Sequence, residues 1–214
     1  MSIGRPEVTR IVIRMSERPH RPALFADLTA LIDAAGGMEP GSRAEIAAAT
    51  AAVVVSAGRQ GAGGTPELVS LADRVGLDTL AALWREADAV SLPGALWALY
   101  LLRQWCHTNG EEVTRLWRAG EALAAPDAAV AGVRDYADVE AVHQVADAVL
   151  TGAYRGDFAV ALERAAALFR VLAAGRRELA GDNDARALEL AVRNERAASD
   201  LAAAAARWRA GTLR

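Results

Sequence analysis

Apolar residues recur every three to four positions along most of the chain, which is the spacing of a buried helix face. One such face follows His20 and ends at a glycine pair; its members are Leu24, Leu28, Leu31, Ile32 and Ala35, ahead of Gly36 and Gly37. Further faces follow Ser42, Thr65 and Asp78 and continue to the C-terminus. Segment 8–15 fits a strand, a helix or an extended arm, but a lone strand would lack a partner. The pattern therefore predicts an all-α protein.

The segment from about Leu92 to His107 is the least amphipathic of the expected helices. Its large apolar residues point to most sides: Leu96, Trp97, Leu99, Tyr100, Leu101 and Leu102. A helix that is apolar nearly all round is buried. Ser91, Asp157 and Asp184 are typical helix-start residues, and Gly175 is typical of a helix end. We therefore expect a compact bundle of about seven to nine helices around this Trp-rich central helix.

The length fits one domain. The chain has 214 residues, of which 53% are hydrophobic and 24% charged, so it can bury a core without disulfides and is not a disordered chain. The breaks at 58–64 and 126–136 are too short to demand separate domains. We expect a single helical domain over 1–214, and leave open an N-terminal subregion at 1–60 beside a helical core at 65–214.

Several features predict a cytoplasmic protein without a membrane partner. Residues 2–21 lack the apolar run of an export signal, and the most apolar run, 92–102, is about half a membrane span. The single cysteine, Cys106, fits a reducing compartment. The net charge of −3 gives no global basic field, which argues against nucleic acid as a partner without settling the question.

All 24 basic side chains are arginine, because the chain contains no lysine. A GC-rich genome would explain this, since lysine codons are poor in G and C. The functional alternative is that arginine serves bidentate anion binding. We prefer the genomic explanation, because the arginines are spread along the chain.

One helix face carries residues that could ligate a metal. Glu140, His143 and Asp147 are spaced to lie together, and Glu-x-x-His is half of a di-iron carboxylate site. The second half is absent, so only a mononuclear site is conceivable, completed by Glu112 or Glu163. A solvated polar face is the preferred interpretation, and we expect no cofactor.

Two other motifs lack complete chemistry. Cys106 and His107 are sequence neighbours, which point about 100° apart on a helix and do not form a dyad. We expect Cys106 to be buried and His107 to lie near a helix C-terminus. The glycine-rich stretch Gly58–Gly64 matches no phosphate-binding motif and is interpreted as a connector.

Segment Leu71–Asp88 has the spacing of a helix-turn-helix motif, with its second helix over Leu80–Asp88. DNA reading would use Arg74 and Arg85. The same segment carries three acidic side chains that would repel the phosphates of DNA, however: Asp78, Glu86 and Asp88. A helical hairpin in the core is the preferred interpretation.

Four tryptophans fall within 34 residues of one another: Trp84, Trp97, Trp105 and Trp117. Tryptophan buries a large area and its N–H needs a partner, so the group could line a ligand pocket or an interface. A core in which alanines leave room for large side chains is the simpler interpretation.

The stretches Leu92–Arg103 (LPGALWALYLLR) and Gly156–Ala165 (GDFAVALERA) resemble a group of uncharacterised actinobacterial proteins. The similarity covers the C-terminal half of the chain. That group has no assigned activity, so the resemblance implies a GC-rich bacterial origin and no site residue.

These observations favour a non-enzymatic protein-interaction module, because no catalytic constellation is complete. Self-association would use the Ala-rich terminal helix from Asp184, with Trp208 on its apolar side, and predicts a homo-oligomer. One alternative is a transcription-associated DNA-binding regulator that uses 71–88. A second is a metal- or small-molecule-binding helical enzyme centred on His143.

Overall fold

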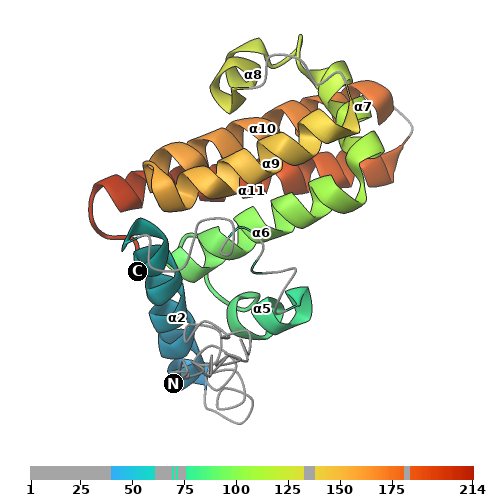
Figure 1. Ribbon diagram of the computed structural model, residues 1–214. Helices are drawn as coiled ribbons and strands as arrows, with labels where there is room; N and C mark the ends of the chain where they lie inside the picture. Colours follow the sequence, from blue (N-terminus) through green and yellow to red (C-terminus); the bar gives the residue numbers. More distant parts are fainter. Residues whose placement is uncertain (1–39, 61–68, 70, 72–75, 133–137, 181–183) are drawn as a thin grey trace, which may run out of the picture.

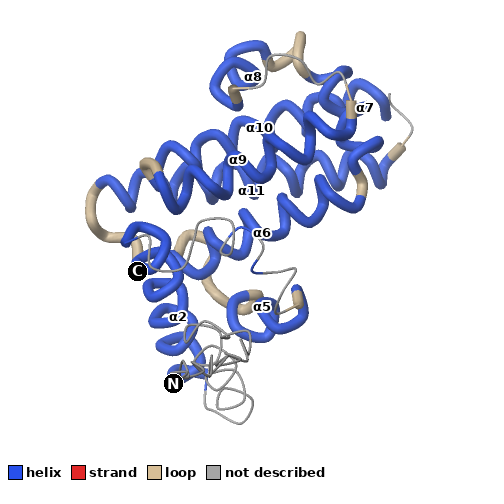
Figure 2. The backbone as a smooth tube through the Cα atoms, viewed as in Figure 1, coloured by secondary structure: helices blue, strands red, loops and turns tan. Residues whose placement is uncertain are grey.

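The computed structural model describes residues 40–60, 69, 71, 76–132, 138–180 and 184–214. These residues form eight named α-helices and no strand (Figures 1 and 2), which confirms the all-α class. The helices are α2 (Pro40–Gln60), α5 (Leu77–Trp84), α6 (Leu92–Thr108), α7 (Gly110–Gly120), α8 (Ala125–Ala131), α9 (Val139–Arg155), α10 (Phe158–Ala180) and α11 (Ala185–Arg209). The segments 8–15 and 24–35 and most of 58–64 lie outside the described residues.

Helices α9, α10 and α11 run side by side and α6 lies along them (Figure 1). Helix α10 packs against α7, α8, α9 and α11, while α6 packs against α2, α5, α7, α9, α10 and α11. Ten of the 17 residues of α6 are buried, so the predicted central helix is confirmed. Within the described ranges, no helix is both long and apolar enough to cross a membrane.

The predicted helix starts are held by side-chain caps. Each capping oxygen accepts a backbone N–H from the first turn: Ser91 from Gly94 at 3.2 Å, Asp157 from Ala159 at 2.8 Å, and Asp184 from Ala187 at 2.9 Å. These contacts satisfy donors that the helix itself leaves open. Local sequence therefore determines where α6, α10 and α11 begin.

The predicted helix end at Gly175 is wrong, because α10 continues to Ala180. Gly175 lies where α10 crosses α7, and a Cβ there would be 1.9 Å from the Leu116 carbonyl oxygen. The facing Gly120 is equally close, with its Cβ position 2.1 Å from the Val171 carbonyl oxygen. The two glycines let the helix backbones touch, and this crossing fixes α7 against the C-terminal part of α10.

One further expected boundary differs. Helix α2 continues past Gly58, where a Cβ would lie 2.7 Å from Cδ1 of Tyr154, so this glycine also serves close packing. The segment 126–136, which the sequence predicts to be a linker or a short turn of helix, contains most of α8, a short helix with Pro126 in its first turn that ends before Gly132. Proline at a helix start and a left-handed glycine after its end are typical of such a turn.

Trp208 lies on the buried side of α11, as expected from the sequence, and small residues make up most of that side. Val192 is 49% exposed, and the buried positions are mostly alanines: Ala191, Ala198, Leu201, Ala204 and Ala205. These small residues pack closely along α10, and the Trp208 ring lies edge-on to Phe158 at 4.7 Å between centroids. The face proposed for self-association is therefore already covered within the chain.

Candidate functional site

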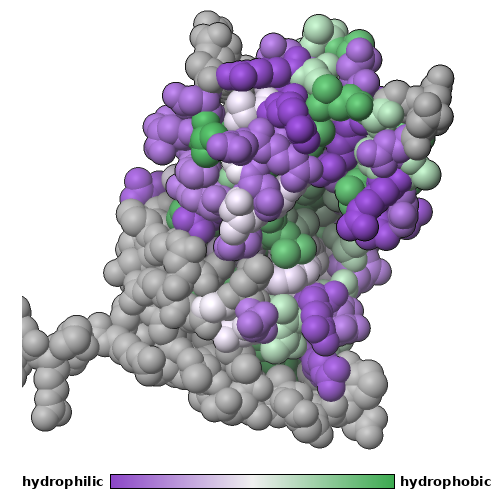
Figure 3. Space-filling model, turned by 90° about the vertical axis from the view of Figure 1, so that its right-hand side faces the viewer, coloured by the Kyte–Doolittle hydropathy of each residue, from purple (hydrophilic) through white to green (hydrophobic). Residues whose placement is uncertain are grey.

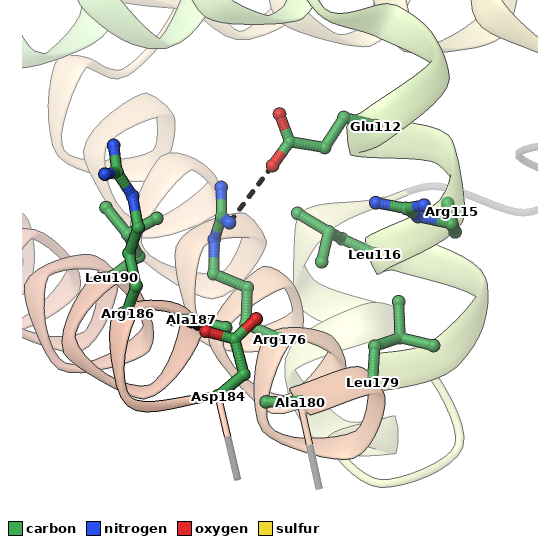
Figure 4. A pocket seen from close by; sticks show the side chains of 10 residues that line it. All are labelled: Glu112, Arg115, Leu116, Arg176, Leu179, Ala180, Asp184, Arg186, Ala187 and Leu190. Carbon is green, nitrogen blue, oxygen red and sulfur yellow. Dashed lines mark hydrogen bonds and ion pairs between the residues drawn. The ribbon is translucent and has the colours of Figure 1, made fainter.

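A cavity of about 380 Å³ lies between α7, α10 and α11 (Figure 4). Charged and apolar side chains line it in equal number: Glu112, Arg115, Arg176, Asp184 and Arg186, with Leu116, Leu179, Ala180, Ala187 and Leu190. We call it the arginine cavity. The helix ends that surround it lie on the right-hand side of Figure 1, which faces the viewer in Figure 3. That face is mainly hydrophilic and carries small hydrophobic patches.

Arg176 is the most buried charged residue of the arginine cavity, at 9% exposure. Its Nη1 forms an ion pair with Oε1 of Glu112 at 3.0 Å, and its guanidinium lies 5.2 Å from the centre of the Trp105 ring. Its Nε is buried and has no hydrogen-bond acceptor among the described residues. A buried donor without an acceptor is unfavourable, so Arg176 has binding capacity that the described part of the chain does not use.

Two exposed arginines flank this buried one. The guanidinium groups of Arg115 on α7 and Arg186 on α11 lie on either side of Arg176 (Figure 4). In the part of the chain that the structure describes, neither has an ion-pair partner. Asp184 already accepts the N–H of Ala187 as a helix cap. Among the described residues of the lining, three guanidinium groups stand against two carboxylates, which is a formal charge of +1.

The local sequence explains how these side chains reach one place. Arg176 follows Gly175, so it lies next to the closest contact of α10 with α7 and reaches Glu112 one turn before Leu116. Arg186 is the second residue of α11, two positions after the Asp184 cap. The sequence pattern does not single out these three arginines, because they lie on three different helices and Arg115 is more than sixty residues from the other two. The absence of lysine was the one signal that pointed to them.

A second polar cluster joins α6 to α9. Oδ1 of Asp147 accepts Nε of Arg103 at 2.6 Å and is 3.0 Å from Nε2 of His107. The rings of His107 and His143 stack, with centroids 4.4 Å apart and planes 15° apart. Arg103 is only 8% exposed, so Asp147 compensates a buried charge. The cluster therefore orients His107 and holds the two helices together.

The stacked imidazoles line a cavity of their own. It measures about 460 Å³, includes Glu111 and Glu112 in its lining, and we call it the imidazole cavity. Nε2 of His143 is buried and has no partner among the described residues; it faces Gly110, where a Cβ would lie 3.2 Å away. Glu112, the ion-pair partner of Arg176, lines both cavities.

The structure brings together two of the three metal-ligand candidates. His143 and Asp147 belong to the cluster just described, whereas Glu140 is exposed and accepts Nε2 of Gln144 at 3.2 Å. Glu163 is paired with Arg209 instead. In the described ranges, no group of three His, Cys, Asp or Glu side chains is placed to hold a metal ion.

The tryptophans do not gather at one place. Trp84 and Trp117 are fully buried, and their indole N–H groups donate to Thr50 at 3.1 Å and Glu121 at 2.8 Å. Trp97 and Trp105 on α6 are partly buried against the core. None of the four lines the arginine cavity or the imidazole cavity. Their positions accord with the core interpretation.

The candidate DNA-binding segment is described only in part. Arg74 lies outside the described residues, and Arg85 is exposed and pairs with Glu86 at 3.2 Å. Helix α5 ends at Trp84, earlier than the expected Asp88, and its residues Leu80, Leu83 and Trp84 are buried. These burials favour a packing role for the segment.

No family model, curated protein or solved structure matches this chain. The resemblance to uncharacterised actinobacterial proteins therefore stays a prediction, and the function must be argued from the geometry.

Cys106 is 1% exposed and His107 lies in the last turn of α6, as expected from the sequence. Burial, followed by the charge of Asp147, raises the pKa of Cys106 to about 12. The thiol is therefore protonated at neutral and mildly alkaline pH, and only the thiolate is an effective nucleophile. We expect iodoacetamide at about pH 8, just below the ordinary thiol pKa, to leave native Cys106 unmodified. Mass spectrometry should show full alkylation after denaturation; equal rates for native and denatured protein would contradict this burial.

Proposed function

We propose that this protein binds a small organic anion in the arginine cavity. The observation that carries the proposal is the buried Arg176, whose Nε lacks an acceptor in the described structure beside a cavity. A guanidinium presents its donors in a planar fork that matches a carboxylate or phosphate. Burial strengthens such a contact, because water competes with it less.

The flanking charges support the same proposal. Arg115 and Arg186 give the cavity mouth two further cations without ion-pair partners in the described part of the chain. The cavity volume of about 380 Å³ falls in the usual range for small-molecule sites. This function differs from the helical enzyme centred on His143 that the sequence suggested, because it requires neither a metal nor a reaction and His143 does not line the arginine cavity.

The interaction-module hypothesis has weaker support. Its proposed surface, the alanine side of α11, is packed on α10, so self-association would need another face. Deleting residues 184–214 would expose α10 and would not test self-association cleanly. Homo-oligomer formation stays a prediction.

Calorimetric titration of the purified chain with acetate, succinate, benzoate and inorganic phosphate tests the proposed function. We expect at least one anion to bind with a Kd of about 1 mM or tighter. An Arg186→Gln variant should bind that anion about tenfold more weakly, since it loses one charge-assisted contact of about 1.5 kcal/mol.

Arg196→Gln is the matched control for Arg186→Gln. Arg196 is also an exposed arginine of α11, but it does not line the arginine cavity. We expect this variant to bind like the wild type. Equal weakening in both variants would indicate attraction by overall charge, and the absence of binding by these four anions and by butanoate and hexanoate would refute the proposed function.

A further inference from the structure

The arginine cavity also contains leucine side chains that a bare inorganic anion would not use. Leu116 and Leu190 lie on opposite sides of Arg176, and Leu179 lies on the same side as Leu116 (Figure 4). Leu179 is 51% exposed. Among the seven large exposed hydrophobic residues of the described structure, it alone lines the arginine cavity or the imidazole cavity. An apolar ligand body would cover it.

The charges of the cavity limit the charge of the ligand. The described residues of the lining carry a formal charge of +1, with Glu112 paired with Arg176 and Asp184 capping α11. A monoanion neutralises that lining. A dianion would leave an excess negative charge near two carboxylates, which is unfavourable in a partly enclosed site.

We infer that the ligand is a monocarboxylate with an apolar body of several carbons. This inference rests on the proposed function and specifies its ligand class. The carboxylate contacts the guanidinium groups of Arg176 and its neighbours, and the hydrocarbon lies against Leu116, Leu179 and Leu190. Polar and apolar groups are thus recognised by neighbouring side chains of one lining, as is usual for small-molecule sites.

A chain-length series tests this ligand class. Calorimetric titration with acetate, butanoate and hexanoate should give an affinity that rises about fourfold for each added methylene, until the leucine side is covered. Succinate and inorganic phosphate should bind more weakly than hexanoate. A flat series, or tighter binding of succinate or phosphate, would overturn the inference.

Leu179→Gln provides the second arm. Because Leu179 is half exposed, this variant should keep the wild-type melting curve, while hexanoate binding weakens about tenfold and acetate binding stays unchanged. Val192→Gln is the control, since Val192 is 49% exposed on α11 but does not line the cavity. Equal losses in both variants, or no loss in Leu179→Gln, would contradict the apolar contact.

The ligand class and the anion-binding function can be refuted separately. If phosphate or succinate binds more tightly than hexanoate and Arg186→Gln weakens that binding, the ligand class is wrong and the anion cavity stands. If no anion in either panel binds, both fall.

Discussion

A Gly175→Ala variant should lose about 3 kcal/mol of unfolding free energy, at the upper end for overpacking substitutions. The added Cβ would lie 1.9 Å from the carbonyl oxygen of Leu116 and 3.1 Å from the backbone nitrogen of Gly120. Both are backbone atoms, so no side-chain rotation can relieve the contact. The helices α7 and α10 must move apart, which also separates Glu112 from Arg176. Urea denaturation followed by circular dichroism measures the loss.

Gly152→Ala is the control for this prediction. Gly152 lies inside α9, and its nearest contact for an added Cβ is Ala161 at 3.7 Å, an ordinary distance. Alanine has a higher helix propensity than glycine, so this variant should gain up to about 1 kcal/mol. Wild-type stability in Gly175→Ala would show that the two helices do not cross as described.

Replacing Arg176 with methionine should weaken binding of the preferred anion about a hundredfold, since a charge-assisted hydrogen bond contributes about 1.5–3 kcal/mol. Methionine keeps an apolar stem near Trp105 but removes every donor. The partner Glu112 has a side chain that is 35% exposed and can be rehydrated, so we expect only a small loss of stability. Calorimetric titration and a urea melt measure the two effects separately.

Arg103→Met should lower stability and leave anion binding intact, the opposite of Arg176→Met, if the two buried arginines have different roles. Arg103 is buried to a similar degree as Arg176, but its carboxylate partner is Asp147 and it does not line the arginine cavity. We expect this variant to lose about 2 kcal/mol of unfolding free energy, because it removes the 2.6 Å hydrogen bond from Arg103 to Asp147 that joins α6 to α9, and to keep anion binding. Loss of binding in both variants would point to a general effect on folding.

The sequence predicted the helices where local rules decide their limits. Ser91, Asp157 and Asp184 cap the helices that they were expected to cap, because capping depends on neighbouring residues alone. Gly175 misled the prediction, since glycine is typical both of helix ends and of close helix crossings. Which of the two applies depends on α7, more than fifty residues earlier in the chain.

The candidate site was harder to predict for the same reason. Spacing alone placed His143 and Asp147 on one helix face, and the structure brings both to His107. Nothing local connects Arg115 with Arg176, because their proximity depends on how α7 and α10 cross. The arginines of the cavity therefore looked like a dispersed composition bias until the fold placed them together.

The most direct test of anion binding at Arg176 is the arginine Nε–H spectrum of the labelled protein. The signal of Arg176 is assigned by its absence in Arg176→Met. We expect the Nε–H signal of Arg176 to shift as hexanoate is added and to stop shifting once the cavity is filled, because the buried Nε gains an acceptor. A signal that stays unmoved through titrations with hexanoate, succinate and phosphate would contradict the account.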